Sequence, residues 1–189
     1  MWTPAYNAQF AKPLLNQLIA LIQRDQGDAL AGINAARAAE GNSPLDPITE
    51  FHKGPGMRTG WPWLSLEIGA TSFDRDADRT TRHQEIRILL VLETGQYDQE
   101  MAQADAQDYA RLLDQIVTSA GPWPALADWS TPLPIQHETA ATSTTFPNAA
   151  GTVCDAFVES HVPEKVSVPG IDAPVMRITV TVLFELEET

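Results

Sequence analysis

The sequence predicts an α+β fold, in which a mainly antiparallel sheet is flanked by an N-terminal helix and a central helix, with long loops. Three observations predict it. The segment 82–94 is a long aliphatic run typical of a strand, and the segment 98–120 repeats apolar residues at helical spacing. The segment 175–187 alternates apolar and polar residues with the period of two that strands show. We expect a single domain over residues 1–189.

The strand at 82–94 is apolar on both of its faces. Leu89 and Val91 point to one face, and the opposite face carries Ile86, Ile88, Leu90 and Leu92. A strand with one solvated face alternates strictly, so this strand is predicted to lie inside a sheet with both faces covered. The alternating strand at 175–187 is long enough to pair along its whole length, which would close the core.

Apolar stripes and end signals predict two helices. The central helix begins at the N-cap Asp98 and ends at Gly121-Pro122. Its stripe consists of Tyr109, Leu112, Leu113, Ile116, Val117 and Ala120. The N-terminal helix runs from about Ala8 to Ala39. Glycines at 27 and 32 weaken its second half, so 28–39 is either a separate helix or a bent continuation.

The other segments are predicted as shorter strands and loops. After a short apolar stretch at 48–51, Leu64, Leu66 and Ile68 alternate with polar residues as a half-buried strand. The order that follows is a charged loop at 71–81, a long Pro-rich loop at about 121–150, a strand at 151–162 and a turn at 163–174.

Composition limits the function. The net charge of −13 repels phosphate, which argues against sequence-reading nucleic-acid binding. No apolar run approaches the roughly 20 residues that cross a bilayer, and the N-terminus lacks a signal-peptide pattern, so no membrane partner is expected. Cys154 is the only cysteine and cannot form an intrachain disulfide, which fits synthesis in the cytoplasm.

One acidic pattern resembles a calcium loop. Asp74, Asp76, Asp78 and Glu85 occupy the acidic positions of such a loop, whose oxygen ligands surround the ion. Arg79 stands where the sharp turn needs glycine, and Glu85 lies in a predicted strand rather than a helix. Nearby arginines also neutralise the same acids. The pattern therefore favours a solvated charged loop over a metal site.

Catalytic patterns are weaker still. The histidines at 52, 83, 137 and 161 show no short ligand spacing of the kind that zinc sites use. His83 and Glu85 share one face of a strand end, where they either hold a metal, transfer a proton or form an ordinary surface hydrogen bond. There is no GxSxG motif, and Cys154 in a strand is more often a small buried hydrophobe. We expect neither catalytic residues nor a cofactor.

Four of the five tryptophans fall in or beside Pro-rich loops. They are Trp61, Trp63, Trp123 and Trp129. Such aromatics either cover the edge of the core or serve as anchors of a protein interface, and the sequence leaves both interpretations open.

The layout resembles the tail terminator (tail completion) proteins of long-tailed bacteriophages and related phage-like particles. The resemblance covers most of the chain and rests on element order and hydrophobic pattern. The segments that carry it follow the N-terminal helix: WPWLSLEI at 61–68, HQEIRILLVL at 83–92, YARLLDQI at 109–116 and the final strand 175–187. The chain departs from the family pattern by its Pro-rich segment at 121–150.

The resemblance implies a ring, typically a hexamer, at the head-proximal end of the tail tube. Such a ring ends tube polymerisation and joins the tail to the head connector, so its partners are its own copies, the tail tube protein and head–tail connector proteins. The acidic charge fits a lumen through which genomic DNA passes without specific binding. The implied location is the virion tail or neck, assembled in the cytoplasm of the bacterial host. The loops at 61–63 and 121–150, or an edge of the strand at 82 or 175, would then supply contacts between subunits.

Rival interpretations remain open. Within the same assembly, the chain would instead be another head–tail connector, neck or tail-tube subunit. A small metal-dependent enzyme would use the acidic loop with His83. A monomeric binding module would hold a ligand with its loop tryptophans.

Overall fold

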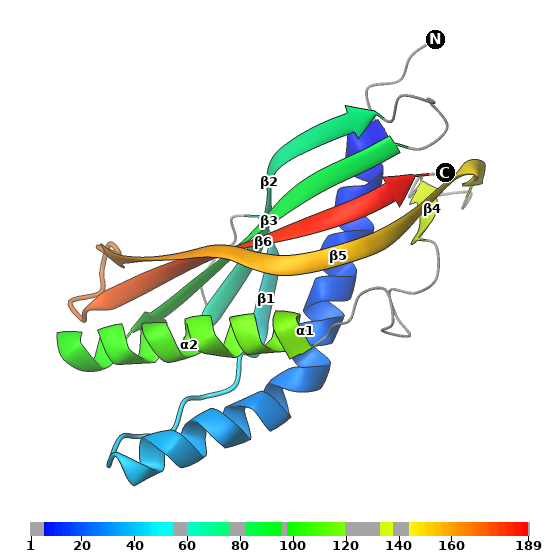
Figure 1. Cartoon of the computed structure of the whole chain (residues 1–189). Coiled ribbons are helices and arrows are strands. Elements are labelled where there is room, and N and C mark those ends of the chain that lie inside the picture. Colours follow the sequence, from blue (N-terminus) through cyan, green and yellow to red (C-terminus); the bar gives the residue numbers. More distant parts are fainter. Residues whose placement is uncertain are drawn as a thin grey trace.

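A computed structural model describes residues 6–54, 60–75, 82–95, 98–119, 133–137 and 144–188 (Figure 1). It confirms the predicted α+β class: a sheet packs against helices α1 (Tyr6–Ala39) and α2 (Gln99–Ser119). The described strands form one six-stranded sheet in the order β1-β2-β3-β6-β5-β4. Their bounds are β1 Glu50–Lys53, β2 Trp63–Arg75, β3 Arg82–Gly95, β4 Leu133–His137, β5 Thr144–Val166 and β6 Val175–Glu188. Only β1 and β2 pair in parallel among these strands, so the sheet is mainly antiparallel, as predicted.

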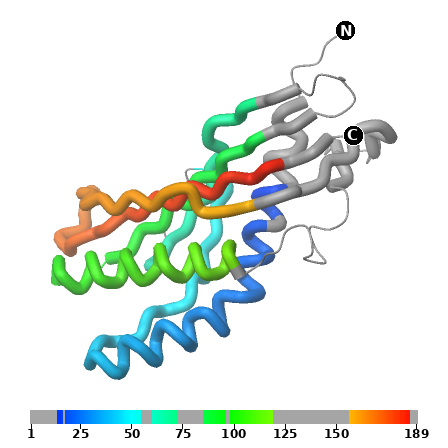
Figure 2. The backbone as a smooth tube through the Cα atoms, viewed as in Figure 1, coloured from blue at the N-terminus to red at the C-terminus, as the bar shows by residue number. Residues whose placement is uncertain are grey.

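Strands β3 and β6 form the middle of the sheet. They pair without interruption from Arg82 opposite Glu188 to Gly95 opposite Val175, and Figure 2 shows them side by side. This confirms the predicted pairing along the whole strand. It also shows that the suggested subunit contact through an edge of either strand is wrong, because β2 and β5 occupy those edges.

The core lies between the sheet and the helices. The predicted stripe of α2 is buried from Tyr109 to Val117, and the α1 side chains of Leu14, Leu18 and Ile22 are fully buried. The sheet contributes one face of its central strands, Ile86, Ile88, Leu90, Leu92, Ile178, Val180, Val182 and Phe184, all at 0% exposure. Burying each such side chain contributes roughly 1.5–3 kcal/mol, so this face fixes the strand register.

Helix α1 is a single element, and Figure 1 shows that it changes direction along its length. The second half is therefore a bent continuation rather than a separate helix. The helix ends where Gly41 adopts a φ of 79°, and the Asn42 N–H donates to the Arg37 carbonyl at 2.9 Å. At the start of α2, the Asp98 carboxylate accepts from the Glu100 N–H at 2.7 Å, which confirms the predicted N-cap.

Two boundaries in the second half of the chain are corrected. The segment 121–150 is not one long loop, because it contains β4 and the first residues of β5. Strand β5 also runs past the predicted end at Val162 and includes Pro163, which was predicted in a turn. Both errors come from reading proline as a strand breaker, whereas strands at a sheet edge tolerate it.

Two predicted faces are corrected as well. Ile68 was expected in the core but is 50% exposed, whereas Ser65, expected to be solvated, is fully buried. The register of β2 shifts between Ile68 and Thr71, beyond the point where β1 stops pairing with it. The face of β3 that carries Leu89 and Val91 is only half-buried, so the prediction that both faces are covered is wrong for the single chain.

Candidate interaction surface

The sheet has a second face, which we call the outer face: the side of β2, β3, β6 and β5 turned away from α1 and α2. Side chains alternate across a sheet, so Leu89 and Val91 lie on it, opposite the buried face of β3. Leu183 on β6 is paired with both Arg87 and Phe157, which places a leucine and a phenylalanine side by side.

Apolar groups in the centre of the outer face remain accessible. Phe157 is 40% exposed and Val162, opposite Thr179, is 57% exposed, whereas Leu183 between its neighbours is 5% exposed. The same face carries Leu89, Val91, Thr179 and Thr181, and on β5 the polar residues Glu159 and Ser160 lie between Phe157 and Val162. Phe157 and Val162 are thus the accessible apolar groups that make this face a candidate site of protein association.

An ion pair crosses this centre, because Arg87 on β3 lies opposite Leu183 and its partner Glu159 lies on β5 between Phe157 and Val162. Arg87 holds Glu159 through two hydrogen bonds of 2.9 and 3.0 Å and lies 3.6 Å from Glu85. The hydrogen bond from Arg87 keeps the pKa of Glu159 below its ordinary value. The centre of the outer face is therefore mixed, with exposed apolar groups on either side of an ion pair that is neutralised within the chain.

A second ion pair lies at one end of the outer face. Arg177 donates to the buried Glu93 at 2.7 Å and to the exposed Glu164 at 3.1 Å. Beyond it, Trp63 is 4% exposed and stacks on His52 with ring centroids 5.3 Å apart. Trp63 is therefore buried against the sheet and is not an exposed interface anchor. Trp123 and Trp129 lie outside the described residues.

The two edges of the sheet differ from its outer face. Strand β1 covers β2 only from Trp63 to Leu66, and β4 pairs with β5 only up to Gly151. The rest of the β5 edge is irregular, because its register shifts twice, after Val153 and after Val158, and Pro163 follows. Bulges and proline hinder strand addition, so β5 is a blunted edge.

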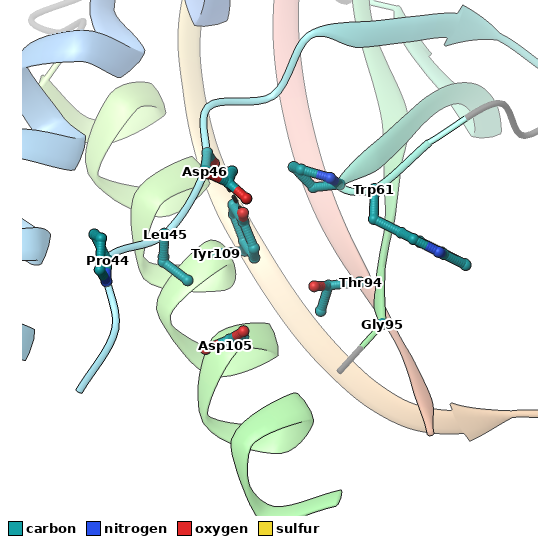
Figure 3. A pocket seen from close by; sticks show the side chains of 9 residues that line it. Pro44, Leu45, Asp46, Trp61, Thr94, Gly95, Asp105 and Tyr109 are labelled. Atoms are coloured by element: carbon teal, nitrogen blue, oxygen red, sulfur yellow. Dashed lines mark hydrogen bonds between the residues drawn. The ribbon is translucent and has the colours of Figure 1, made fainter. Parts of the chain in front are cut away.

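A small pocket opens where α2 meets the end of β3 (Figure 3). Its volume is about 50 Å³, and Asp105, Tyr109, Thr94 and Trp61 are among its lining residues. The Tyr109 hydroxyl donates to the Asp46 carbonyl at 2.8 Å, and burial raises the pKa of this phenol. The space suits a few water molecules, since pockets for small-molecule ligands hold about 300–1,000 Å³.

A wider groove of about 480 Å³ lies between α2 and β5. Ala110 and Ile178 form its buried floor, and Asp114, Arg111 and His161 are among the polar groups that line it. Its lining has two carboxylates, Asp108 and Asp114, against the one arginine, and Asp108 is bound by Arg37 from α1. Its volume lies within the range of small-molecule pockets.

The predicted metal residues are only partly placed. Asp76 and Asp78 lie outside the described residues, as do the side chains of Asp74 and His83. The Glu85 carboxylate accepts from the Ser72 hydroxyl at 2.7 Å. Among the described residues, no group of three or more His, Cys, Asp or Glu side chains is arranged to hold a metal ion. None of the described helices is long and apolar enough to cross a membrane.

The other predicted candidates stay apart. His52 packs against Trp63, and His161 lines the groove beside α2. The side chains of His137 and Cys154 lie outside the described part of the chain. The sequence analysis did not identify Phe157 and Val162 as surface residues. The available signal was that both lie in a predicted strand among polar residues.

Comparison with known proteins gives limited information. No protein-family model matches the chain, and no curated protein matches it. One similar solved structure is described as "Virion of native gene transfer agent (GTA) particle", with a TM-score of 0.38 and 12% sequence identity. The match covers 73% of this chain and 78% of that chain. At this level of similarity we draw no functional conclusion from it.

Proposed function

We propose that the chain is a structural subunit of a phage-like particle, a tail terminator that forms a ring at the head-proximal end of the tail. The observation that carries the proposal is the outer face, where Phe157 and Val162 are exposed in one chain and the charged groups Arg87 and Arg177 are paired with carboxylates of the same chain. A subunit of an assembly needs such a surface, because contacts between subunits bury apolar side chains inside a polar rim.

The charge supports the same role. A net charge of −13 disfavours attachment to DNA, which a channel component must let pass. The element order that resembles tail terminators gives the more specific part of the proposal. In this role the protein binds its own copies, the tail tube protein and the head–tail connector, it resides in the virion, and it needs no catalytic residue or cofactor.

The first test is the mass of the purified protein by light scattering over a range of concentrations, followed by negative-stain imaging. Closed rings with a central hole of DNA width are expected. Open-ended tubes would replace this role with that of a tail-tube subunit. A monomer whose melting temperature rises with calcium or zinc would overturn the proposal in favour of a metal-dependent protein, because a bound ion stabilises the folded state.

A further inference from the structure

We infer that the groove between α2 and β5 binds a carboxylate carried on an apolar body, supplied by a small organic acid or by an acidic side chain. The groove belongs to one chain, so this binding goes beyond the proposed ring and does not depend on it. Its basis is an arginine of the groove that has no carboxylate of its own.

Arg111 on α2 differs from the other arginines in the described part of the chain. Its side chain forms no hydrogen bond or ion pair with any residue that the structure describes. With 25 acidic residues in the chain, an arginine readily finds a carboxylate. The other arginines with described side chains each bind one at 2.6–2.9 Å: Arg24, Arg37, Arg87 and Arg177. Arg111 is therefore available to a ligand.

The two carboxylates closest to Arg111 along the helix are already engaged. Asp108 and Asp114 stand one turn before and after it, a spacing at which ion pairs form on helices. Asp108 instead accepts from Arg37 on α1, and the Asp114 carboxylate accepts from the Thr118 hydroxyl at 3.2 Å. The guanidinium of Arg111 thus lines the groove with its donors unused.

Two further donors line the same space. They are His161 on β5 and Gln107, which lies one turn before Arg111 on α2. Neither side chain forms a hydrogen bond or ion pair within the described part of the chain. The floor of the groove is apolar and buried, because Ala110 is 4% exposed and Ile178 is 0% exposed. This floor suits the carbon atoms of a ligand.

These groups favour a carboxylate over other ligands. A guanidinium fork binds a planar carboxylate through two parallel hydrogen bonds, and imidazole and amide N–H groups donate to its other lone pairs. A phosphate dianion would meet stronger repulsion from Asp108 and Asp114. A cation would be repelled by Arg111 and would find the aspartates already engaged. The volume of about 480 Å³ suits a small molecule.

The test uses three probes of one shape: phenylacetate, the neutral phenylacetamide and the cation phenethylammonium. Each is titrated into the isotope-labelled full chain, and NMR signals of α2 and β5 report binding. Phenylacetate should shift the side-chain signals of Arg111 and His161 and bind at least about fivefold more tightly than phenylacetamide, because only the acid forms charge-assisted hydrogen bonds. The cation should bind most weakly. Equal affinity for the acid and its amide would overturn the inference.

Variants assign the effect to Arg111. Arg111→Gln should weaken phenylacetate binding about fivefold or more, whereas Arg24→Gln, which removes the same charge from an exposed position on α1, should leave it unchanged. Asp114→Asn should strengthen binding, because it removes a negative charge beside the ligand. Equal binding in the two arginine variants would contradict the site, and weaker binding in Asp114→Asn would replace it with a site for cations.

A blocked Leu-Glu-Leu peptide distinguishes the two sources of the carboxylate. Tighter binding of the peptide than of phenylacetate supports the site and assigns it to an acidic side chain, and the reverse order supports it as a site for a free acid. Light scattering of the same samples keeps the two proposals apart. Rings without phenylacetate binding would remove only this site, whereas phenylacetate binding to a chain that forms no rings would remove only the proposed function.

Discussion

Arg37 on α1 donates to Asp105 on α2 at 2.6 Å, and the two side chains are 6% and 4% exposed. The same guanidinium donates to Asp108 and, through Nε, to the Ser43 carbonyl at 2.7 Å. One arginine therefore joins the N-terminal helix, the loop that follows it and the central helix. Because the pair is buried, its loss leaves a carboxylate without a counter-charge.

Replacing Arg37 with methionine should lower the free energy of unfolding by about 3–5 kcal/mol, because the buried Asp105 loses its cation. Arg24→Met is the control, since Arg24 pairs with Asp25 where both side chains are exposed, at 46% and 35%. That change should cost less than about 1 kcal/mol. Urea unfolding measures both. Equal losses of unfolding free energy in the two variants would show that the buried pair contributes no more to stability than the exposed pair.

The two carboxylates bound by Arg177 should differ strongly in their contributions. Glu93 is fully buried and Glu164 is 51% exposed. We expect Glu93→Gln to cost about 2 kcal/mol, because a charge-assisted hydrogen bond is lost in a buried place. Glu164→Gln should cost less than about 0.5 kcal/mol. Thermal unfolding of the two variants measures both losses of stability. A larger loss of stability for Glu164→Gln than for Glu93→Gln would contradict the difference in burial.

Alkaline pH should destabilise the fold through Tyr109. Burial, the largest cause, raises the pKa of its phenol above the ordinary value of 10.0. The unfolded chain therefore releases this proton first, so the stabilisation is fully present below about pH 10 and is lost as the pH rises above it. Tyr109→Phe should cost about 1 kcal/mol at neutral pH through the lost hydrogen bond and should flatten the alkaline decline. Unfolding measured from pH 7 to 11 tests this, and an unchanged slope in the variant would contradict it.

Calcium should leave the melting temperature unchanged. Glu85 already accepts a hydrogen bond from Ser72 and lies on β3, and the acidic segment before it carries arginines that neutralise its charge. Calorimetry measures the melting temperature in about 1 mM calcium, a concentration at which weak calcium sites bind, and again in EDTA. A rise that Glu85→Gln abolishes would instead establish the acidic loop as a metal site.

The sequence predicted the middle of the sheet better than its periphery. Strands β3 and β6 are long and regular, and burial of one face of each sets their register. The start of β5 and all of β4 were missed, because Pro134 and Pro147 were read as breakers. At a sheet edge, a proline whose backbone nitrogen faces away from the neighbouring strand removes no ladder hydrogen bond, and at a bulge the ladder is already interrupted, so the usual rule does not apply there.

The candidate surface was only half predictable for a different reason. Periodicity showed that Leu89 and Val91 make a second apolar face on β3, but it does not show what covers that face. Coverage depends on where α1 and α2 pack, and both helices lie on the other side. Phe157 joins the same patch because β6 lies between β5 and β3, and the pairing of β6 with β3 joins segments far apart in the sequence, which no local pattern reveals.

The position of β3 beside β6 also bears on how the chain folds. The hairpin of β2 and β3 and the hairpin of β5 and β6 each join neighbouring segments, whereas the seam between β3 and β6 joins Gly95 to Val175 and Arg82 to Glu188. Closing a loop on the order of 100 residues costs chain entropy before any contact repays it. We therefore expect the two hairpins to form first and the pairing of β3 with β6 to form slowly afterwards. The high contact order of this pairing, rather than the stability of the fold, should set the folding rate.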